Sequence, residues 1–105
     1  MSSTRIIKRV DYKEFKELID KFLHKIVVNS HAYFRLNESQ RKVYKDDQLI
    51  NILTEEQPVL IGIQGNNNYA TFFNRKEGYL RIIFEVKKDK IEIITFYITE
   101  TLPKI

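Results

Sequence analysis

Apolar residues recur at helical spacing near the start of the chain. Asp11 is followed three residues later by Glu14, and this capping-box pattern predicts a helix that begins after Asp11. Apolar side chains then recur three or four residues apart, as on one helix face, at Phe15, Leu18, Ile19, Phe22, Leu23 and Ile26. We expect residues 1–10 to form a short lead-in and residues 25–28 to form a short extended link.

A second amphipathic helix is predicted over residues 31–43, with Ser30 as its cap. Its apolar side chains, among them Ala32 and Leu36, gather on one side of the helical wheel. His31 and Arg35 are four residues apart and lie together on the opposite, polar side. This places a titratable group beside a permanent positive charge.

The pattern then changes from helix to strand. A third helix is expected to begin at Asp46 or Asp47 and to end before Pro58. Beyond it, runs rich in β-branched and aromatic residues predict strands. These runs cover residues 58–64, 69–74, 78–87 and 90–99. The short gaps between them indicate that neighbouring strands are antiparallel.

Helices first and strands second indicate an α+β fold. We expect two or three N-terminal helices packed on a four-stranded antiparallel β-meander. All 105 residues are expected to form a single domain. Its parts are a lead-in at 1–10, a helical part at 11–56, the antiparallel sheet at 58–99 and a tail at 100–105.

The last predicted hairpin also has an expected register. A two-residue turn places Phe84 opposite Ile93 and Leu80 opposite Tyr97, on a mostly apolar face that should meet the helices. Arg81 then lies on the reverse face. A slip of one residue would exchange these partners, because successive side chains point to opposite faces of a strand.

The composition of the chain limits the cellular compartment and the kinds of catalysis that we expect. The chain has no cysteine, which excludes disulfides and a thiol nucleophile. Its apolar runs are too short to cross a membrane or to form a signal peptide, so we expect a cytoplasmic protein with no membrane partner. The net charge of +4 permits a polyanionic partner without demanding one.

Most catalytic patterns are missing from the sequence. The two histidines, His24 and His31, have no acidic cluster near them at the spacing of metal ligands. The three glycines form no phosphate-binding loop, and there is no G-x-S-x-G motif. The sequence therefore predicts no metal site and no cofactor, which leaves metal-free acid–base chemistry or binding alone.

His31 and Arg35 fit one such chemistry. Histidine titrates near neutral pH, and the planar charge of arginine suits phosphate. In RNA cleavage by internal transfer, a base takes the proton of the 2′-hydroxyl and a cation stabilises the charge that develops on the phosphate. The other interpretation is that both residues belong to an ordinary solvated helix face.

The order of the motifs along the chain resembles the order in a known family. In "SHAYFR", residues 30–35, a histidine–alanine pair is followed by an arginine four positions after the histidine. A helix that ends near a proline follows, then strands, and then "IEIITFY" at 91–97. This order resembles a small family of uncharacterised domains grouped with the barnase, EndoU, colicin and RelE-like toxin ribonucleases. The resemblance covers roughly residues 26–99.

The resemblance implies a RelE-like fold that cleaves or binds RNA, often as a toxin whose partner is an antitoxin protein. His31 and Arg35 match the motif of the family's helix, and Thr95 and Tyr97 match its closing strand. Members commonly carry a second arginine four residues after the first. This chain lacks it at that position, and its next arginine is Arg41.

On this basis we expect a toxin-like, metal-independent endoribonuclease that works through attack of the 2′-hydroxyl on the phosphate. His31 is the candidate base or acid, Arg35 the candidate phosphate ligand, and Tyr97 the candidate proton donor or stacking residue. The candidate substrate-binding residues are Arg41, Arg81, Thr95, Tyr33 and Phe34.

Two other classes of function stay open. One is a non-catalytic module of a mobile element or toxin–antitoxin system that binds a protein or nucleic acid. An open sheet edge at residues 59–64 would favour it. The other is a structural dimer that buries the helix face with Phe34. Binding alone should tolerate His31→Gln, whereas acid–base catalysis should not.

Overall fold

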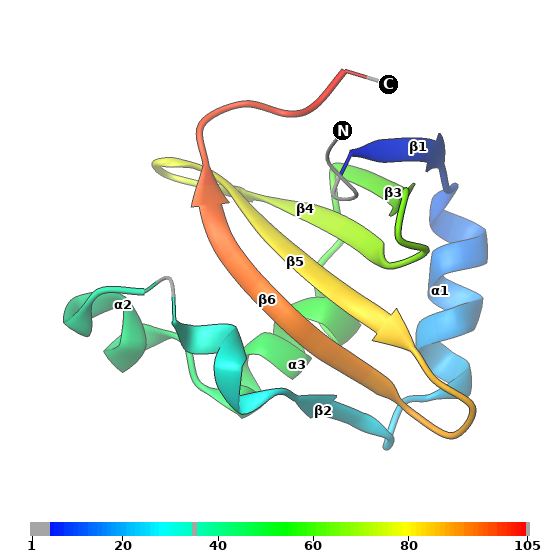
Figure 1. Cartoon of the computed structure of the whole chain (residues 1–105), viewed down its shortest axis with the longest axis horizontal. Helices are drawn as coiled ribbons and strands as arrows, with labels where there is room; N and C mark the ends of the chain where they lie inside the picture. Colours follow the sequence, from blue (N-terminus) through cyan, green and yellow to red (C-terminus); the bar gives the residue numbers. More distant parts are fainter. Residues whose placement is uncertain (1–4, 35, 105) are drawn as a thin grey trace.

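Helices dominate the first half of the chain and strands the second (Figure 1). The computed structural model describes residues 5–34 and 36–104, without the side chains of residues 38, 40 and 41. In chain order the elements are β1 (Ile6–Arg9), α1 (Tyr12–Lys21), β2 (Ile26–Val28), the 3₁₀ helix η1 (Ser30–Tyr33), α2 (Glu38–Val43), α3 (Asp46–Glu55), β3 (Leu60–Gln64), β4 (Tyr69–Arg75), β5 (Gly78–Val86) and β6 (Ile91–Thr99).

The strands form one six-stranded mixed sheet in the order β1-β3-β4-β5-β6-β2. All neighbours are antiparallel except β2 and β6, which are parallel. The expected RelE-like architecture, helices on a four-stranded antiparallel meander, is therefore wrong, although the fold is α+β. The lead-in contributes β1 and the link after α1 contributes β2, and both short segments pair with strands far away in the sequence.

The edge of the meander at β3 is covered by β1, so the open edge at residues 59–64 that would favour a binding module is absent from the described structure. Gly62 makes this pairing possible. A Cβ atom at Gly62 would lie 2.4 Å from Cγ2 of Ile6 and 3.1 Å from the carbonyl oxygen of Lys8. Only a residue without a side chain lets the two strands approach so closely.

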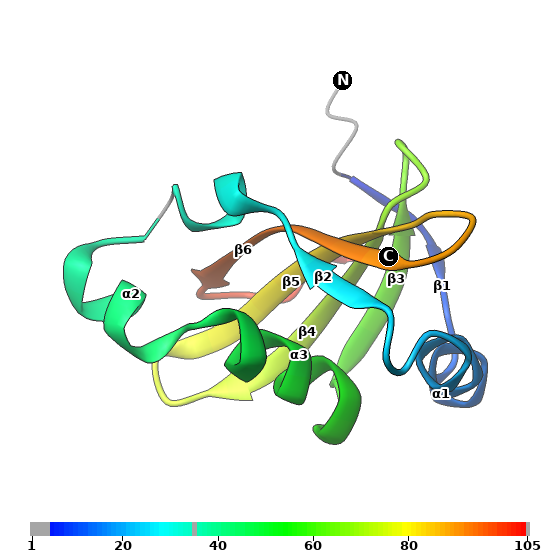
Figure 2. The same cartoon turned by 90° about the horizontal axis from the view of Figure 1, so that it is seen from below.

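The helices α1 and α3 lie on the same face of the sheet (Figure 2). The predicted cap of α1 is confirmed, because the Asp11 side chain accepts a hydrogen bond from the Glu14 N–H at 2.8 Å. The predicted third helix is confirmed as α3. Between these helices and the sheet lies the main core, whose largest fully buried residues include Phe15, Phe84, Phe96, Leu49 and Leu53.

The helix predicted over residues 31–43 is wrong as a single element. The chain forms the short η1, residues 36 and 37 are not helical and include the buried Leu36, and α2 follows. Asn29 caps η1 in place of Ser30, since its side chain accepts a hydrogen bond from the His31 N–H at 2.8 Å. Arg35 lies outside the described residues, so its predicted position beside His31 stays a prediction.

The register of the last hairpin is confirmed only near its turn. Phe84 pairs with Ile93 as expected, but β6 then contains a bulge and the pairing shifts by one residue. Arg81 therefore pairs with Tyr97, and the expected pairing of Leu80 with Tyr97 is wrong. The extra residue of the bulge turns Tyr97 away from the helices.

The sheet face away from α1 and α3 has a smaller apolar cluster of its own. Its buried members are Ile6, Leu60, Ala70, Phe72 and Ile83, and Tyr79, Tyr97 and Leu102 pack against them. The tail after β6 thus contributes Leu102 to this face. Among the described residues, no helix has the length and apolar character needed to cross a membrane.

Candidate functional site

The predicted site residues occupy two neighbouring places in the fold. One group lies on or beside η1, and the other lies on β5 and β6. The two places adjoin because η1 packs along β6 (Figures 1 and 2). The first group contains His31, Tyr33 and Phe34, and the second contains Arg81, Thr95 and Tyr97. Arg35 and the side chain of Arg41 lie outside the described residues.

The position of His31 is set by Asn29. The Asn29 backbone N–H donates to the carbonyl of Ile93 in β6 at 2.9 Å, while its side-chain oxygen accepts from the His31 N–H. The side-chain amide of Asn29 donates to Oε2 of Glu92 at 2.7 Å. Two of these hydrogen bonds reach β6 and the third reaches His31, so Asn29 ties the start of η1 to β6.

Glu92 is held in turn by Lys87, which donates a hydrogen bond to Oε1 of the same carboxylate. The hydrogen bond from Lys87, together with the one from Asn29, lowers the pKa of the Glu92 carboxyl. The hydrogen bond to Glu92 raises the pKa of Lys87. Both groups stay charged at neutral pH, so the link from β6 to η1 is a charge-assisted one.

The imidazole of His31 is exposed to solvent. In the described parts of the chain it has no hydrogen-bond or ion-pair partner. Its backbone is fixed through Asn29, whereas its ring nitrogens are accessible to a ligand. Such a group is able to exchange a proton with a bound molecule.

Arg81 and Tyr97 are brought together by the bulge in β6. The Arg81 guanidinium lies 5.1 Å from the ring centroid of Phe72 and 5.8 Å from that of Tyr97. Its Nη2 donates to Oε1 of Gln64 at 2.8 Å, and Gln64 is completely buried. The sequence prediction had placed Tyr97 on the other face of the sheet from Arg81. The observed arrangement puts a partly buried cation beside a phenol.

Thr95 lies on the same strand as Tyr97, two residues earlier, and pairs with Ile83. Its hydroxyl oxygen is buried and has no hydrogen-bond partner among the described residues. Buried hydroxyl groups are usually satisfied in folded proteins. No described residue therefore forms a hydrogen bond with the hydroxyl oxygen of Thr95.

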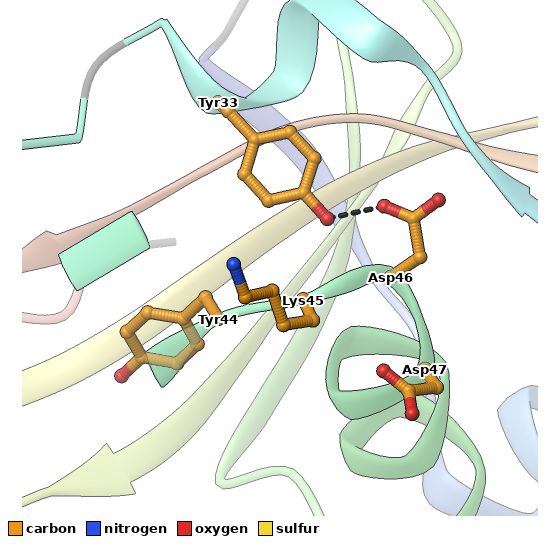
Figure 3. A pocket seen from close by; sticks show the side chains of 5 residues that line it. All are labelled: Tyr33, Tyr44, Lys45, Asp46 and Asp47. Atoms are coloured by element: carbon orange, nitrogen blue, oxygen red, sulfur yellow. Dashed lines mark hydrogen bonds between the residues drawn. The ribbon is translucent and has the colours of Figure 1, made fainter. Parts of the chain in front are cut away.

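Tyr33 points in a different direction from Tyr97, toward the helix side of the sheet. Its ring contacts Phe96 at a centroid distance of 5.3 Å and an interplanar angle of 88°. Its hydroxyl donates to the carboxylate of Asp46 at the start of α3 (Figure 3). Burial, together with this hydrogen bond, raises the pKa of Tyr33 well above its usual range. Tyr33 stays protonated at neutral pH, which suits binding better than proton transfer.

Beside Tyr33 lies a cavity of about 470 Å³ that no pattern in the sequence predicted. Its walls come from η1 and from the segment that enters α3, and they consist of Tyr33, Tyr44, Lys45, Asp46 and Asp47 (Figure 3). The run of two aspartates before an apolar pattern had indicated only the beginning of a helix. Asn29 was also missed, because a cap residue gives no sign of the side chains it will reach.

No group of three or more metal-ligating side chains comes together within residues 5–34 and 36–104. Comparisons with family models, with curated proteins and with solved structures gave no match.

Proposed function

We propose that this protein is a toxin-like endoribonuclease that cleaves RNA through attack of the 2′-hydroxyl on the adjacent phosphate, without a metal ion. The observation that best supports this is the position of His31. Asn29 fixes its backbone beside β6, the strand that carries Thr95 and Tyr97, and its imidazole is open to solvent. RNA supplies its own nucleophile, so the protein has to provide only proton transfer and positive charge.

In the proposed reaction, neutral His31 takes the proton of the 2′-hydroxyl. The oxygen attacks phosphorus and forms a 2′,3′-cyclic phosphate, while the bond to the 5′-oxygen breaks. Tyr97 is the candidate donor of the proton that this leaving oxygen needs. Arg81 lies beside Tyr97 and supplies positive charge, and Arg35 keeps its predicted role as phosphate ligand. The products are a cyclic phosphate end and a 5′-hydroxyl end.

The remaining predicted residues have supporting roles in this proposal. Thr95 lies two residues before Tyr97 on β6 and is proposed to position it, and Tyr33 and Phe34 offer aromatic surface to the bases. Arg41 is a further phosphate contact. Cytoplasmic RNA is the proposed substrate, and an antitoxin protein is the proposed partner.

A non-catalytic binding module is the second candidate. The exposed apolar side chains after η1 and at the end of α2 favour it, since Phe34 and Val43 are 65% and 64% exposed. His31 also lacks an orienting carboxylate in the described chain. A protein partner on this surface would cover Phe34 and leave His31 without a chemical role.

The deciding experiment compares wild type with His31→Gln on a mixed RNA pool in the presence of EDTA. We expect wild type to produce 2′,3′-cyclic phosphate ends and His31→Gln to be slower by about 100-fold or more. His24→Gln is the matched control, because His24 is the other exposed histidine, and this variant should cleave like wild type. Circular dichroism checks that all three proteins are folded.

Equal cleavage by wild type and His31→Gln would remove His31 from the mechanism. If folded wild type does not cleave any RNA in the pool, the binding module becomes the better assignment. A pull-down of RNA and protein partners with wild type and Phe34→Ser would then test that function.

A further inference from the structure

The cavity beside Tyr33 has prebuilt aromatic walls. Tyr33 lines it from η1, and Tyr44 lines it from the segment just before α3 with its hydroxyl pointing away from Tyr33 (Figure 3). Both rings pack against the fully buried Phe96, with centroid distances of 5.3 and 5.6 Å. Tyr33 is also fixed by its hydrogen bond to Asp46. The two rings therefore need little reorganisation to receive a flat aromatic ligand.

The charged groups that line the cavity are the carboxylates of Asp46 and Asp47 and the ammonium group of Lys45 (Figure 3). Oδ1 of Asp46 accepts the hydrogen bond from Tyr33, and Oδ2 has no hydrogen-bond partner among the described residues. Oδ1 of Asp47 accepts the backbone N–H of Gln48 at 3.1 Å. A ligand that fits this cavity should thus be planar and should carry hydrogen-bond donors on one edge.

We propose that this cavity is a nucleobase subsite that binds guanine, an inference that rests on RNA being the substrate. The Watson–Crick edge of guanine presents two adjacent donors, N1–H and N2–H, which match the two oxygens of one carboxylate. Adenine and cytosine place an acceptor next to their amino group, and uracil has a single N–H between two carbonyl groups. Asp46 therefore favours guanine and opposes the other bases.

The placement of the cavity fits the proposed cleavage site. Tyr33 follows His31 by two residues on the same short helix, so a nucleotide bound in the cavity lies next to the segment that carries His31. Stacking on an aromatic ring contributes to affinity for every base, whereas the carboxylate discriminates between them. Guanine recognition thus selects the nucleotide next to which the chain cleaves.

The test measures binding of GMP, AMP, CMP and UMP to the full chain by NMR titration. All four carry the same phosphate, so any preference comes from the base. We expect GMP to bind at least fivefold tighter than the other three and to shift the amide signals of residues 33 and 44–47. Asp46→Asn should bring GMP to within twofold of AMP. Asp20→Asn, an exposed aspartate on α1, is the matched control and should keep the preference.

Because Asp46→Asn removes a hydrogen bond to Tyr33, a second variant tests the stacking wall. Tyr44→Leu should weaken all four nucleotides by about tenfold and keep GMP in first place. Equal affinity for the four nucleotides, or a guanine preference that survives Asp46→Asn in a folded protein, would overturn the inference.

This binding assay is independent of cleavage, so the two proposals fail separately. Cleavage of RNA with no GMP preference leaves the ribonuclease intact and removes the guanine subsite. Selective binding of GMP by a protein that cleaves no RNA confirms the subsite and removes the ribonuclease.

Discussion

The two faces of the sheet are held together by different interactions. On the face toward α1 and α3, large apolar side chains such as Phe15, Phe84 and Phe96 are buried with almost no exposed surface. On the opposite face the buried apolar cluster is smaller, and polar contacts take a larger share. Gln64 and Arg81 form one such contact, and Lys87, Glu92 and Asn29 form another.

This difference indicates that one face of the sheet provides most of the stability of the fold, whereas the other positions the candidate catalytic residues. Apolar burial on the helix side provides most of the free energy of folding, because it removes the largest area from water. The polar contacts on the other face add less, yet they fix Arg81 and the start of η1. Substitutions on the first face should therefore lower stability, and those on the second should chiefly change the geometry around His31 and Tyr97.

The largest expected effect comes from Phe84→Ala. Phe84 is fully buried, stacks on Tyr69 at a centroid distance of 5.1 Å and contacts Phe15 at 6.4 Å. Loss of the ring should lower the free energy of unfolding by about 3–5 kcal/mol, measured by urea denaturation. Phe84→Leu should lower the free energy of unfolding by a clearly smaller amount. A loss below about 1 kcal/mol for Phe84→Ala would show that the helix side is not the principal core.

A smaller effect is expected for Arg81→Met. This change leaves the Oε1 atom of the buried Gln64 without the donor at 2.8 Å, and we expect a loss of about 1–3 kcal/mol. The double variant Arg81→Met with Gln64→Leu should regain much of that loss, since both polar groups are then gone. Additive losses in the two single variants and the double variant would contradict a coupled polar contact.

The smallest effect is expected for the Glu92 carboxylate, and it depends on pH. Its pKa is lowered in the folded protein, so its contribution to stability is present above the ordinary pKa of 4.5 and is lost as the pH falls through the lowered pKa. Thermal unfolding between pH 7 and pH 3 should show a steeper acid loss for wild type than for Glu92→Gln.

Glu17→Gln is the control for this comparison, because Glu17 is exposed on α1. It should keep the steeper acid loss of wild type. Identical pH curves for wild type and Glu92→Gln would mean that the contacts of Glu92 with Lys87 and Asn29 contribute no measurable stability.

Local patterns were enough to predict α1, α3 and the four strands of the meander. Asp11 and Glu14 are a capping signal within one turn, and β-branched runs bounded by turn residues define β3 to β6. The two edge strands were missed because they are only four and three residues long. Their pairing partners lie more than 50 residues away in the chain, where periodicity carries no information.

The candidate site was predicted less well than the fold. "IEIITFYIT" contains no glycine to mark the bulge, so the pairing of Arg81 with Tyr97 could not be read from the sequence. Asn29 and Ser30 are equally good caps in isolation, and only contact with Glu92 distinguishes them. The cavity forms because Tyr33 and Tyr44, from two separate segments, both pack against Phe96. Such long-range contacts leave no local pattern in the sequence.

The parallel pairing of β2 with β6 has a consequence for the moment at which the site forms. As the chain leaves the ribosome, residues 26–28 emerge long before residues 91–93, their partners in the sheet. Until then, Asn29 has neither the Ile93 carbonyl nor the Glu92 carboxylate to bind. Under the proposed function, the nascent chain would stay inactive toward the RNA of the ribosome and would become active only after β6 has paired with β2.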